Sequence, residues 1–219
     1  MLTMAARAWA GLAARRGAAA GPIGLHRTLN RTAASASAAP DLNALWEEHI
    51  ATEFEEKCAK AAVATMVPHA TVNHVPVMTG GSGTAALERF YHNHFIHNMP
   101  PDVQLTPIDR VVAKDTVVDE FIFDFTHSVQ MDWMLPGIAP TGKRVRVPFI
   151  VVVKFEGSKL LAERIYWDQA SVLAQLGLID TTGLPVAGAE QAAKATQMAN
   201  GGGDIPSNGL VAKLANGSK

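Results

Sequence analysis

"TVVDEFIFDFTHSV", residues 116–129, determines the class of fold that the sequence predicts. Its β-branched and aromatic residues are typical of a strand, and the side chains of a strand alternate between two faces. Alternation places Phe121, Phe123, Phe125 and His127 on one face and Glu120, Ile122 and Asp124 on the other. Bulky residues on both faces predict a curved sheet, with helices on its concave side and a convex side that could meet a second subunit.

Three other segments share this strand pattern. They are "VQLTPIDRVVA" (103–113), "KRVRVPFIVVVKF" (143–155) and "LLAERIYWD" (160–168). The connections at 114–115 and 156–159 are short, whereas "DWMLPGIAPTG" (132–142) is long. Short polar connections between strand-like segments favour antiparallel hairpins. The second half of the domain is therefore predicted to be an antiparallel sheet.

The helical segments lie mainly before the strands. Residues 41–66 predict a helix that begins at the N-cap Asp41. Its apolar side chains follow three-and-four spacing: Leu42, Leu45, Trp46, Ile50 and Phe54. Thr84 can cap a second helix over 85–99, and residues 169–176 predict a short last helix. Residues 70–83 read as an irregular or short extended stretch. The predicted fold class is α+β, with the N-terminal helices packed on the concave face of a curved antiparallel sheet.

The composition limits the classes of function. With 219 residues and 48% hydrophobic content, the chain can form one domain with extensions. A net charge of −1 argues against a nucleic-acid binder, which would carry a basic patch. The single Cys58 excludes an intramolecular disulfide and a thiolate metal cluster. No apolar run approaches the roughly 20 residues that cross a bilayer, so we expect no membrane span.

The two ends of the chain differ from its middle. Residues 1–40 contain five arginines and no acidic residue among many alanines, which is typical of an organelle transit peptide. We expect a mitochondrial presequence; a chloroplast transit peptide in a photosynthetic organism, or a disordered tail on a cytoplasmic protein, are the alternatives. Residues 181–219 are rich in Gly, Ala, Asn and Thr and predict a mostly disordered tail, with a short helix near 189–198. The domain is expected to span 41–180.

Three stretches of this domain resemble a known family. "FTHSVQMDWMLPGIAPTGKRV" (125–145) and "GSKLLAERIYWDQASVLAQLGL" (157–178) resemble SnoaL-like domains, which are polyketide cyclase and ester cyclase-like proteins of the nuclear transport factor 2-like superfamily. "TVNHVPVMTGG" (71–81) resembles the segment that places an Asn or His near the pocket of such proteins. The resemblance implies a SnoaL-like cone. It does not supply a reaction, because the superfamily includes cyclases, isomerases, dehydratases and non-catalytic members.

Three residues are predicted to be catalytic. Asp168 directly precedes a predicted helix, where an N-cap explains it fully, but the resemblance implies a general acid/base at this position. His127 ends the aromatic row and could transfer protons near neutrality; a core histidine with one hydrogen bond is the alternative. His74 follows Asn73 in an extended segment and could polarise or orient a ligand carbonyl, or it could be exposed beside a turn.

Five further residues are candidates for the binding wall. They are Tyr166, Trp133, His94, Phe125 and Glu163. Trp133 lies in the long hairpin connection, where an apolar tip acts as a lid or as a dimer contact. Glu163 shares a strand face with apolar residues and is a second buried acid. His92 and His94 lie about 200° apart on a helix and cannot share an ion, and His94 and His97 have no obvious third ligand, so we predict no metal. We also predict no cofactor, because proton transfer needs only positioned acceptors and an oxyanion partner.

The predicted function is the binding of a small, partly apolar, carbonyl-containing molecule, with cofactor-free isomerase, cyclase or lyase chemistry if the protein is an enzyme. The alternatives are a non-catalytic ligand-binding or dimeric interaction module, or an accessory partner of a dienelactone-type hydrolase. A homodimer formed through the sheet is expected in either case.

Overall fold

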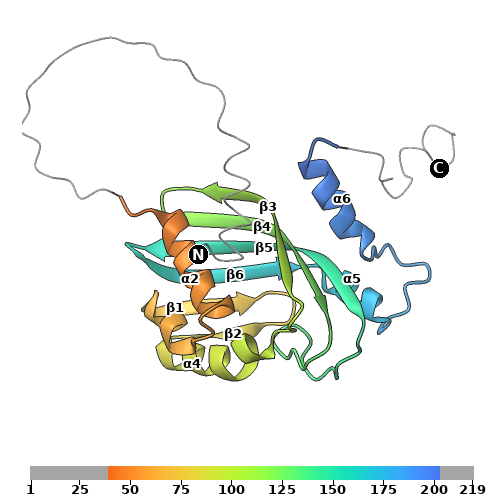
Figure 1. Cartoon of the computed structure of the whole chain (residues 1–219), viewed down its shortest axis with the longest axis horizontal. Helices are drawn as coiled ribbons and strands as arrows, with labels where there is room; N and C mark the ends of the chain where they lie inside the picture. Colours follow the sequence, from red (N-terminus) through yellow and green to blue (C-terminus); the bar gives the residue numbers. More distant parts are fainter. Residues whose placement is uncertain (1–38, 203–219) are drawn as a thin grey trace, which may run out of the picture.

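The structure of the protein is a computed structural model in which residues 39–202 are described (Figure 1). The predicted transit peptide and the end of the C-terminal tail lie outside the described residues. No helix in the described range is long and apolar enough to cross a bilayer.

Six strands form one curved sheet in the order β2-β1-β6-β5-β4-β3 (Figure 1). Their bounds are β1 (Met66–His74), β2 (Thr79–Ser82), β3 (Gln104–Val112), β4 (Thr116–Thr126), β5 (Arg144–Glu156) and β6 (Lys159–Trp167). Four neighbouring pairs are antiparallel, and β1 runs parallel to β6. The predicted α+β class is confirmed. The sheet is mixed and not purely antiparallel, however, because β1 is parallel to β6. The stretch over 70–83, predicted as irregular or short extended, contributes β2 and most of β1.

The first predicted helix is divided into two. α2 (Leu42–Phe54) begins where Asp41 Oδ1 accepts the amide hydrogen of Ala44 at 3.1 Å, so the predicted N-cap is confirmed. α3 (Ala59–Ala64) follows after Lys57, which has a φ of 51°. A non-glycine residue in this left-handed region cannot continue a right-handed helix. The prediction of one helix over 41–66 was therefore wrong at this break and at Met66, where β1 begins.

The second predicted helix is also irregular. α4 (Thr84–Phe90) passes into a π-helical turn, η1 (Tyr91–Phe95), and a 3₁₀ turn, η2 (Ile96–Asn98). Gly83, and not Thr84, occupies the N-cap position. α5 (Gln169–Leu176) matches its predicted range, and α6 (Glu190–Ala199) lies within one residue of the predicted short helix.

The β1–β2 hairpin depends on one glycine. Gly80 pairs with Asn73 and has a φ of +132°. A Cβ atom at this position would lie 2.0 Å from the carbonyl oxygen of Val72, which is far inside contact distance. Only glycine permits this close approach of the two strands. The hairpin in turn holds His74 at the end of β1, on the inner face of the sheet.

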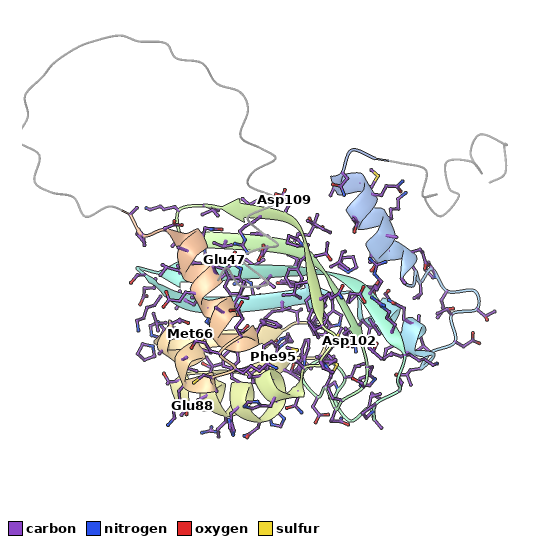
Figure 2. The ribbon with its side chains drawn as sticks, in the orientation of Figure 1. Glu47, Met66, Glu88, Phe95, Asp102 and Asp109 are labelled. Carbon is purple, nitrogen blue, oxygen red and sulfur yellow. The ribbon has the colours of Figure 1, made fainter. Side chains whose placement is uncertain are left out.

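The two faces of the sheet are covered differently. α2 and α4 lie against the concave face, and side chains, Phe95 among them, fill the layer between helices and sheet (Figure 2). On the opposite face, α6 packs Ala192 against Ile108 of β3 and Ile122 of β4. Figure 1 shows α6 apart from α2 and α4. The predicted alternation in β4 therefore separates two cores, with Phe123 in the larger and Ile122 in the smaller.

Candidate functional site

A cavity of about 70 Å³ lies between α2, the η1 segment and the concave face of the sheet. Its lining is largely aromatic and aliphatic, with Trp46, Phe95, Phe123, Trp133, Phe149 and Val151 among the wall residues. Four of the lining residues have titratable side chains that are buried: Glu53, His74, Asp119 and Glu163. Tyr91 adds a buried phenol. Polar groups that converge in an apolar cavity are the usual form of a small-molecule site.

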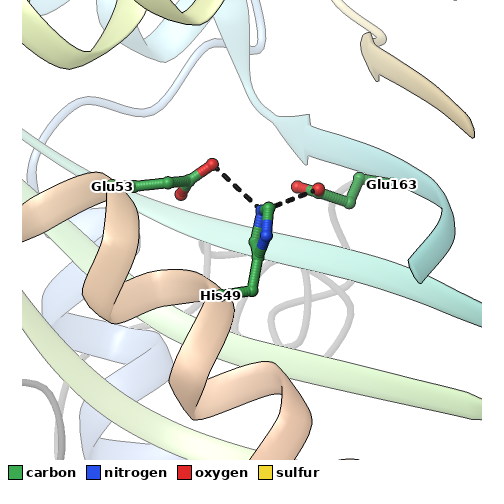
Figure 3. Close-up of side chains that lie close together, drawn as sticks. All are labelled: His49, Glu53 and Glu163. Carbon is green, nitrogen blue, oxygen red and sulfur yellow. Dashed lines mark ion pairs between the residues drawn. The ribbon is translucent and has the colours of Figure 1, made fainter. Parts of the chain in front are cut away.

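The most concentrated polar group sits behind this wall. His49 and Glu53 project from α2, one helical turn apart, and Glu163 projects from β6 (Figure 3). His49 Nε2 lies 3.1 Å from Glu163 Oε1 and 3.2 Å from Glu53 Oε1, and all three side chains are buried. The hydroxyl of Tyr91 donates to Glu163 Oε1 at 3.2 Å. His49 does not line the cavity itself; Glu53, Glu163 and Tyr91 do.

Hydrogen bonding on the other side of the ring fixes the orientation of His49. The hydroxyl of Thr65 donates its one proton to the carbonyl oxygen of Ala62 at 2.7 Å. The contact of 2.6 Å between His49 Nδ1 and Thr65 Oγ1 must therefore be an N–H donated by the ring. Nε2 is left to face the two carboxyl groups. A proton on Nε2 makes the ring an imidazolium that is shared between Glu53 and Glu163.

The charges of this group depend on one another. Burial alone would lower the pKa of His49, but the nearby Glu163 and Glu53 outweigh it and raise the pKa to about 10. Burial raises the pKa of Glu53, against the lowering effect of His49. Burial and the two glutamates also raise the pKa of the Tyr91 phenol well above 10. At neutral pH the ring is therefore charged and Tyr91 remains a hydrogen-bond donor.

His74 has the opposite character. Its ring lies among those of Phe90, Phe95, Trp133 and Trp167, with centroids 5.2 to 5.9 Å away. Burial lowers its pKa to about 4, although Glu163 partly opposes this effect. His74 is therefore neutral at pH 7. Its Nδ1 is buried without a hydrogen-bond partner in the described part of the chain.

A second ion pair fixes α2 to the sheet. Asp119 of β4 accepts a hydrogen bond from Trp46 Nε1 at 2.8 Å and two from Arg110, at 2.9 and 2.7 Å. Arg110 also pairs with Glu47 of α2. A bidentate arginine–carboxylate pair is geometrically specific. The contacts of Asp119 and Arg110 with α2 hold this helix in position, and with it His49 and Glu53.

Three of the residues predicted from sequence come together in the cavity wall: His74, Trp133 and Glu163. Phe125 is buried beside Phe123, with ring centroids 5.2 Å apart, but it does not line the cavity.

The other four predicted residues lie elsewhere. Asp168 caps α5 through the amide of Ser171 at 3.1 Å, as predicted, and its second oxygen accepts from Gln191 of α6 at 2.9 Å. His127 is buried near Thr141, with Nδ1 3.3 Å from the Thr141 hydroxyl. Tyr166 is 40% exposed on the convex side, and His94 is exposed. None of the four lines the cavity. Catalytic roles for Asp168 and His127 remain predictions without support from this geometry.

Sequence reasoning missed His49, Glu53 and Tyr91. A signal was present, because His49 and Glu53 lie seven and eleven residues after the inward-facing Leu42 and therefore share its helical face. Two ionisable residues on the buried stripe of an amphipathic helix are unusual unless they are paired. The partner, Glu163, was a candidate, but nothing in the sequence connects it to α2.

The same group has the donor set of a metal site. The ligand atoms of His49, Glu53 and Glu163 lie within 4.8 Å of one another. A proton on Nε2 already accounts for the close contacts to both carboxyl groups, so we assign no metal to it.

Comparison with protein families identifies the kind of domain. A scan of protein families matches residues 41–176 to "SnoaL-like polyketide cyclase", whereas no curated protein matches the chain.

Three solved structures illustrate the likeness at low identity. A protein with a ketosteroid isomerase-like fold from Catenulispora acidiphila, in complex with trimethylamine, is 17% identical over 64% of this chain and 95% of that chain, with a TM-score of 0.48. TsrD from Streptomyces laurentii is 19% identical, over 63% and 96% of the two chains, with a TM-score of 0.48. A nuclear transport factor 2-like protein from Burkholderia thailandensis is 14% identical, over 61% and 95%, with a TM-score of 0.46. The family match spans most of the described domain, and the chain belongs to the SnoaL-like polyketide cyclase family.

Proposed function

We propose that the protein binds a small, partly apolar carbonyl compound in the central cavity and transfers a proton on or next to its activated C–H bond. Glu163 is the acid/base, His49 holds it from behind and is itself paired with Glu53, and His74 orients the carbonyl group. The reaction class is isomerase, cyclase or lyase chemistry without a bound cofactor.

One observation carries this proposal: Glu163 lines the cavity, contacts the imidazolium of His49 and accepts the hydrogen bond of Tyr91. Glu53 also lines the cavity and contacts the ring, but the hydroxyl of Tyr91 donates to Glu163. A carboxyl group fixed at an apolar wall is well placed for general base catalysis. His74 Nδ1, buried on the same wall, offers a ligand an unused polar contact.

The proposed reaction moves one proton between the ligand and Glu163. The C–H bond next to the carbonyl breaks, its proton passes to Glu163, and the electron pair moves onto the carbonyl oxygen as an enolate. Once Glu163 is protonated, it no longer needs the hydrogen bond from Tyr91, and the phenol can donate to the enolate oxygen. Return of the proton to another carbon gives isomerisation. Attack of the enolate carbon on a second carbonyl of the ligand gives cyclisation, and the alkoxide formed there takes the proton back from Glu163.

Hydrogen–deuterium exchange tests the step with a defined probe. Acetophenone is incubated with the protein in D₂O, and loss of its methyl proton signal is followed by NMR. We expect the protein to accelerate exchange and Glu163→Gln to abolish the acceleration. Asp168→Asn is the matched control, because Asp168 does not line the cavity. If the exchange rate stays high in Glu163→Gln but falls in Asp168→Asn, Asp168 and not Glu163 is the acid/base. Binding without acceleration would support the non-catalytic alternative.

A homodimer through the convex face remains part of the proposal. Ile150 and Tyr166 are opposite each other in the β5–β6 register and are 41% and 40% exposed on that face. Exposed apolar side chains that adjoin across two strands are typical of a contact surface. Light scattering should give twice the chain mass for the native protein and a monomer for Ile150→Glu. A native monomer at micromolar concentration would contradict this dimer.

Import into mitochondria is proposed on the composition of residues 1–40 alone. A fluorescent fusion of the full chain should colocalise with mitochondria, and removal of residues 1–40 should abolish that localisation. An unchanged distribution after the removal would contradict the proposal.

A further inference from the structure

The cavity that contains Glu163 and His74 opens to the outside at one end of α2. Most residues that line it are buried, but Phe54, Met99, Leu105 and Phe121 are half-buried. Three of these four, Phe54, Met99 and Leu105, also line a larger groove of about 580 Å³ on the outside. These three residues are partly exposed and line both spaces, so the cavity opens into the groove between them. We call Phe54, Met99 and Leu105 the neck.

The groove continues outward from the neck. It runs from the C-terminal end of α2, through the Pro100–Pro101 turn, to the start of β3. Its walls are mainly apolar, with Ile96, Val103 and the two prolines, while Glu55 and Lys57 supply charges of both signs at the rim. Glu53 lines both spaces, so the His49 group lies close to the inner end of the groove.

The sizes of the two spaces differ. A cavity of about 70 Å³ is small beside ordinary ligand pockets, which enclose about 300–1,000 Å³. The outer groove supplies space of that order. A ligand that fills only the inner cavity and the neck would therefore be no larger than a simple aryl ketone, and a ligand of ordinary size must extend into the groove.

We propose that the site has two parts and takes an elongated, mainly apolar molecule. Its oxygen-bearing end lies in the inner cavity against Glu163 and His74, and its apolar tail passes between Phe54, Met99 and Leu105 into the groove. This inference rests on the proposed function for the inner end and adds the position and chemical class of the tail.

The test compares two ketones that differ only in the tail. Acetophenone and 4-hexylacetophenone are titrated into the native protein by calorimetry. A fully buried methylene strengthens binding by about fourfold. We therefore expect the hexyl compound to bind at least about tenfold more tightly than acetophenone.

Groove variants locate the origin of this gain. Val103→Trp and Pro101→Trp place a bulky ring on groove walls that do not line the inner cavity. Both should remove the gain from the hexyl tail and leave acetophenone binding unchanged. Val111→Trp is the control, since Val111 lies on the same strand as Leu105 but is 57% exposed and lines neither space. Pro101 is exposed, so Pro101→Trp should fold normally. It keeps the test valid even if Val103→Trp does not fold.

The outcomes separate the two proposals. If acetophenone binds but the tail adds nothing, or if the gain survives both groove variants, the two-part site is wrong and the proposed function stands. If neither ketone binds the native protein, the ligand class of the proposed function is wrong, and the two-part site falls with it.

Discussion

His49 Nδ1 donates a hydrogen bond to the hydroxyl of Thr65, 2.6 Å away at the end of α3, and thereby aims Nε2 at two buried carboxyl groups. The hydroxyl is able to accept because its own proton goes to Ala62. A small polar residue outside the cavity thus determines which ring nitrogen faces the acids.

Replacing Thr65 by valine tests this relationship. Valine has nearly the shape of threonine but leaves the buried Nδ1–H without an acceptor, which costs about 1–3 kcal/mol. The free energy of unfolding, measured in urea, should fall by that amount. Thr65→Ser keeps the hydroxyl and is the matched control. Equal stability of Thr65→Val and the native protein would show that the ring is not held in this way.

His74 should make stability depend on acid pH. Its pKa is about 4 in the folded protein, below the ordinary value of 6.5, so the folded state prefers the neutral ring. The stability that this preference contributes is present above pH 6.5 and is lost as the pH falls towards 4. This shift in pKa corresponds to a loss of unfolding free energy on the order of 3 kcal/mol when His74 is fully protonated.

The variant His74→Phe isolates this contribution. Phenylalanine fills the aromatic surroundings of the ring and cannot be protonated. The loss of unfolding free energy between pH 7 and pH 4 should be smaller in the variant than in the native protein. If the two pH profiles run parallel, His74 is not buried in its neutral form.

The sequence predicted those elements whose determinants are local. Alternation in β4, capping by Asp41 and Asp168, and the spacing in α2 each depend on neighbours a few residues away, and each is observed. The break at Lys57 and the π-helical turn at Tyr91 were not predicted, because neither residue carries a helix-breaking signal in the sequence.

The site itself is non-local. His49 and Glu163 come from opposite ends of the domain. The parallel β1–β6 pairing and the contacts of Asp119 and Arg110 with Trp46 and Glu47 of α2 help to bring them together. Sequence reasoning had identified Glu163, His74 and Trp133 separately, since each lies on an apolar strand or loop. It favoured Asp168, whose local pattern is stronger but whose side chain is engaged by α5 and α6.

Gly80→Ala should destabilise the β1–β2 hairpin severely. The added Cβ would lie 2.0 Å from the backbone oxygen of Val72, so the two strands would have to separate. Gly142 also has a positive φ, of 69°, but a Cβ there would contact nothing within 4 Å. Gly142→Ala therefore carries only the backbone strain, on the order of 1 kcal/mol. Thermal unfolding should show a much larger loss for Gly80→Ala; equal losses would contradict the close strand approach.

Asp168 gives a prediction that separates capping from catalysis. Asp168→Ala removes the acceptor for the Ser171 amide and should lower the free energy of unfolding by about 0.5–2 kcal/mol. Asp168→Asn keeps a capping oxygen. It also keeps the contact to α6 if the amide of Gln191 rotates, so that its oxygen accepts from the new amide group. The asparagine variant should therefore unfold within a few tenths of a kcal/mol of the native protein. A loss as large as that of Asp168→Ala would mean that the charge of Asp168, and not only its oxygen atoms, holds the junction of β6, α5 and α6.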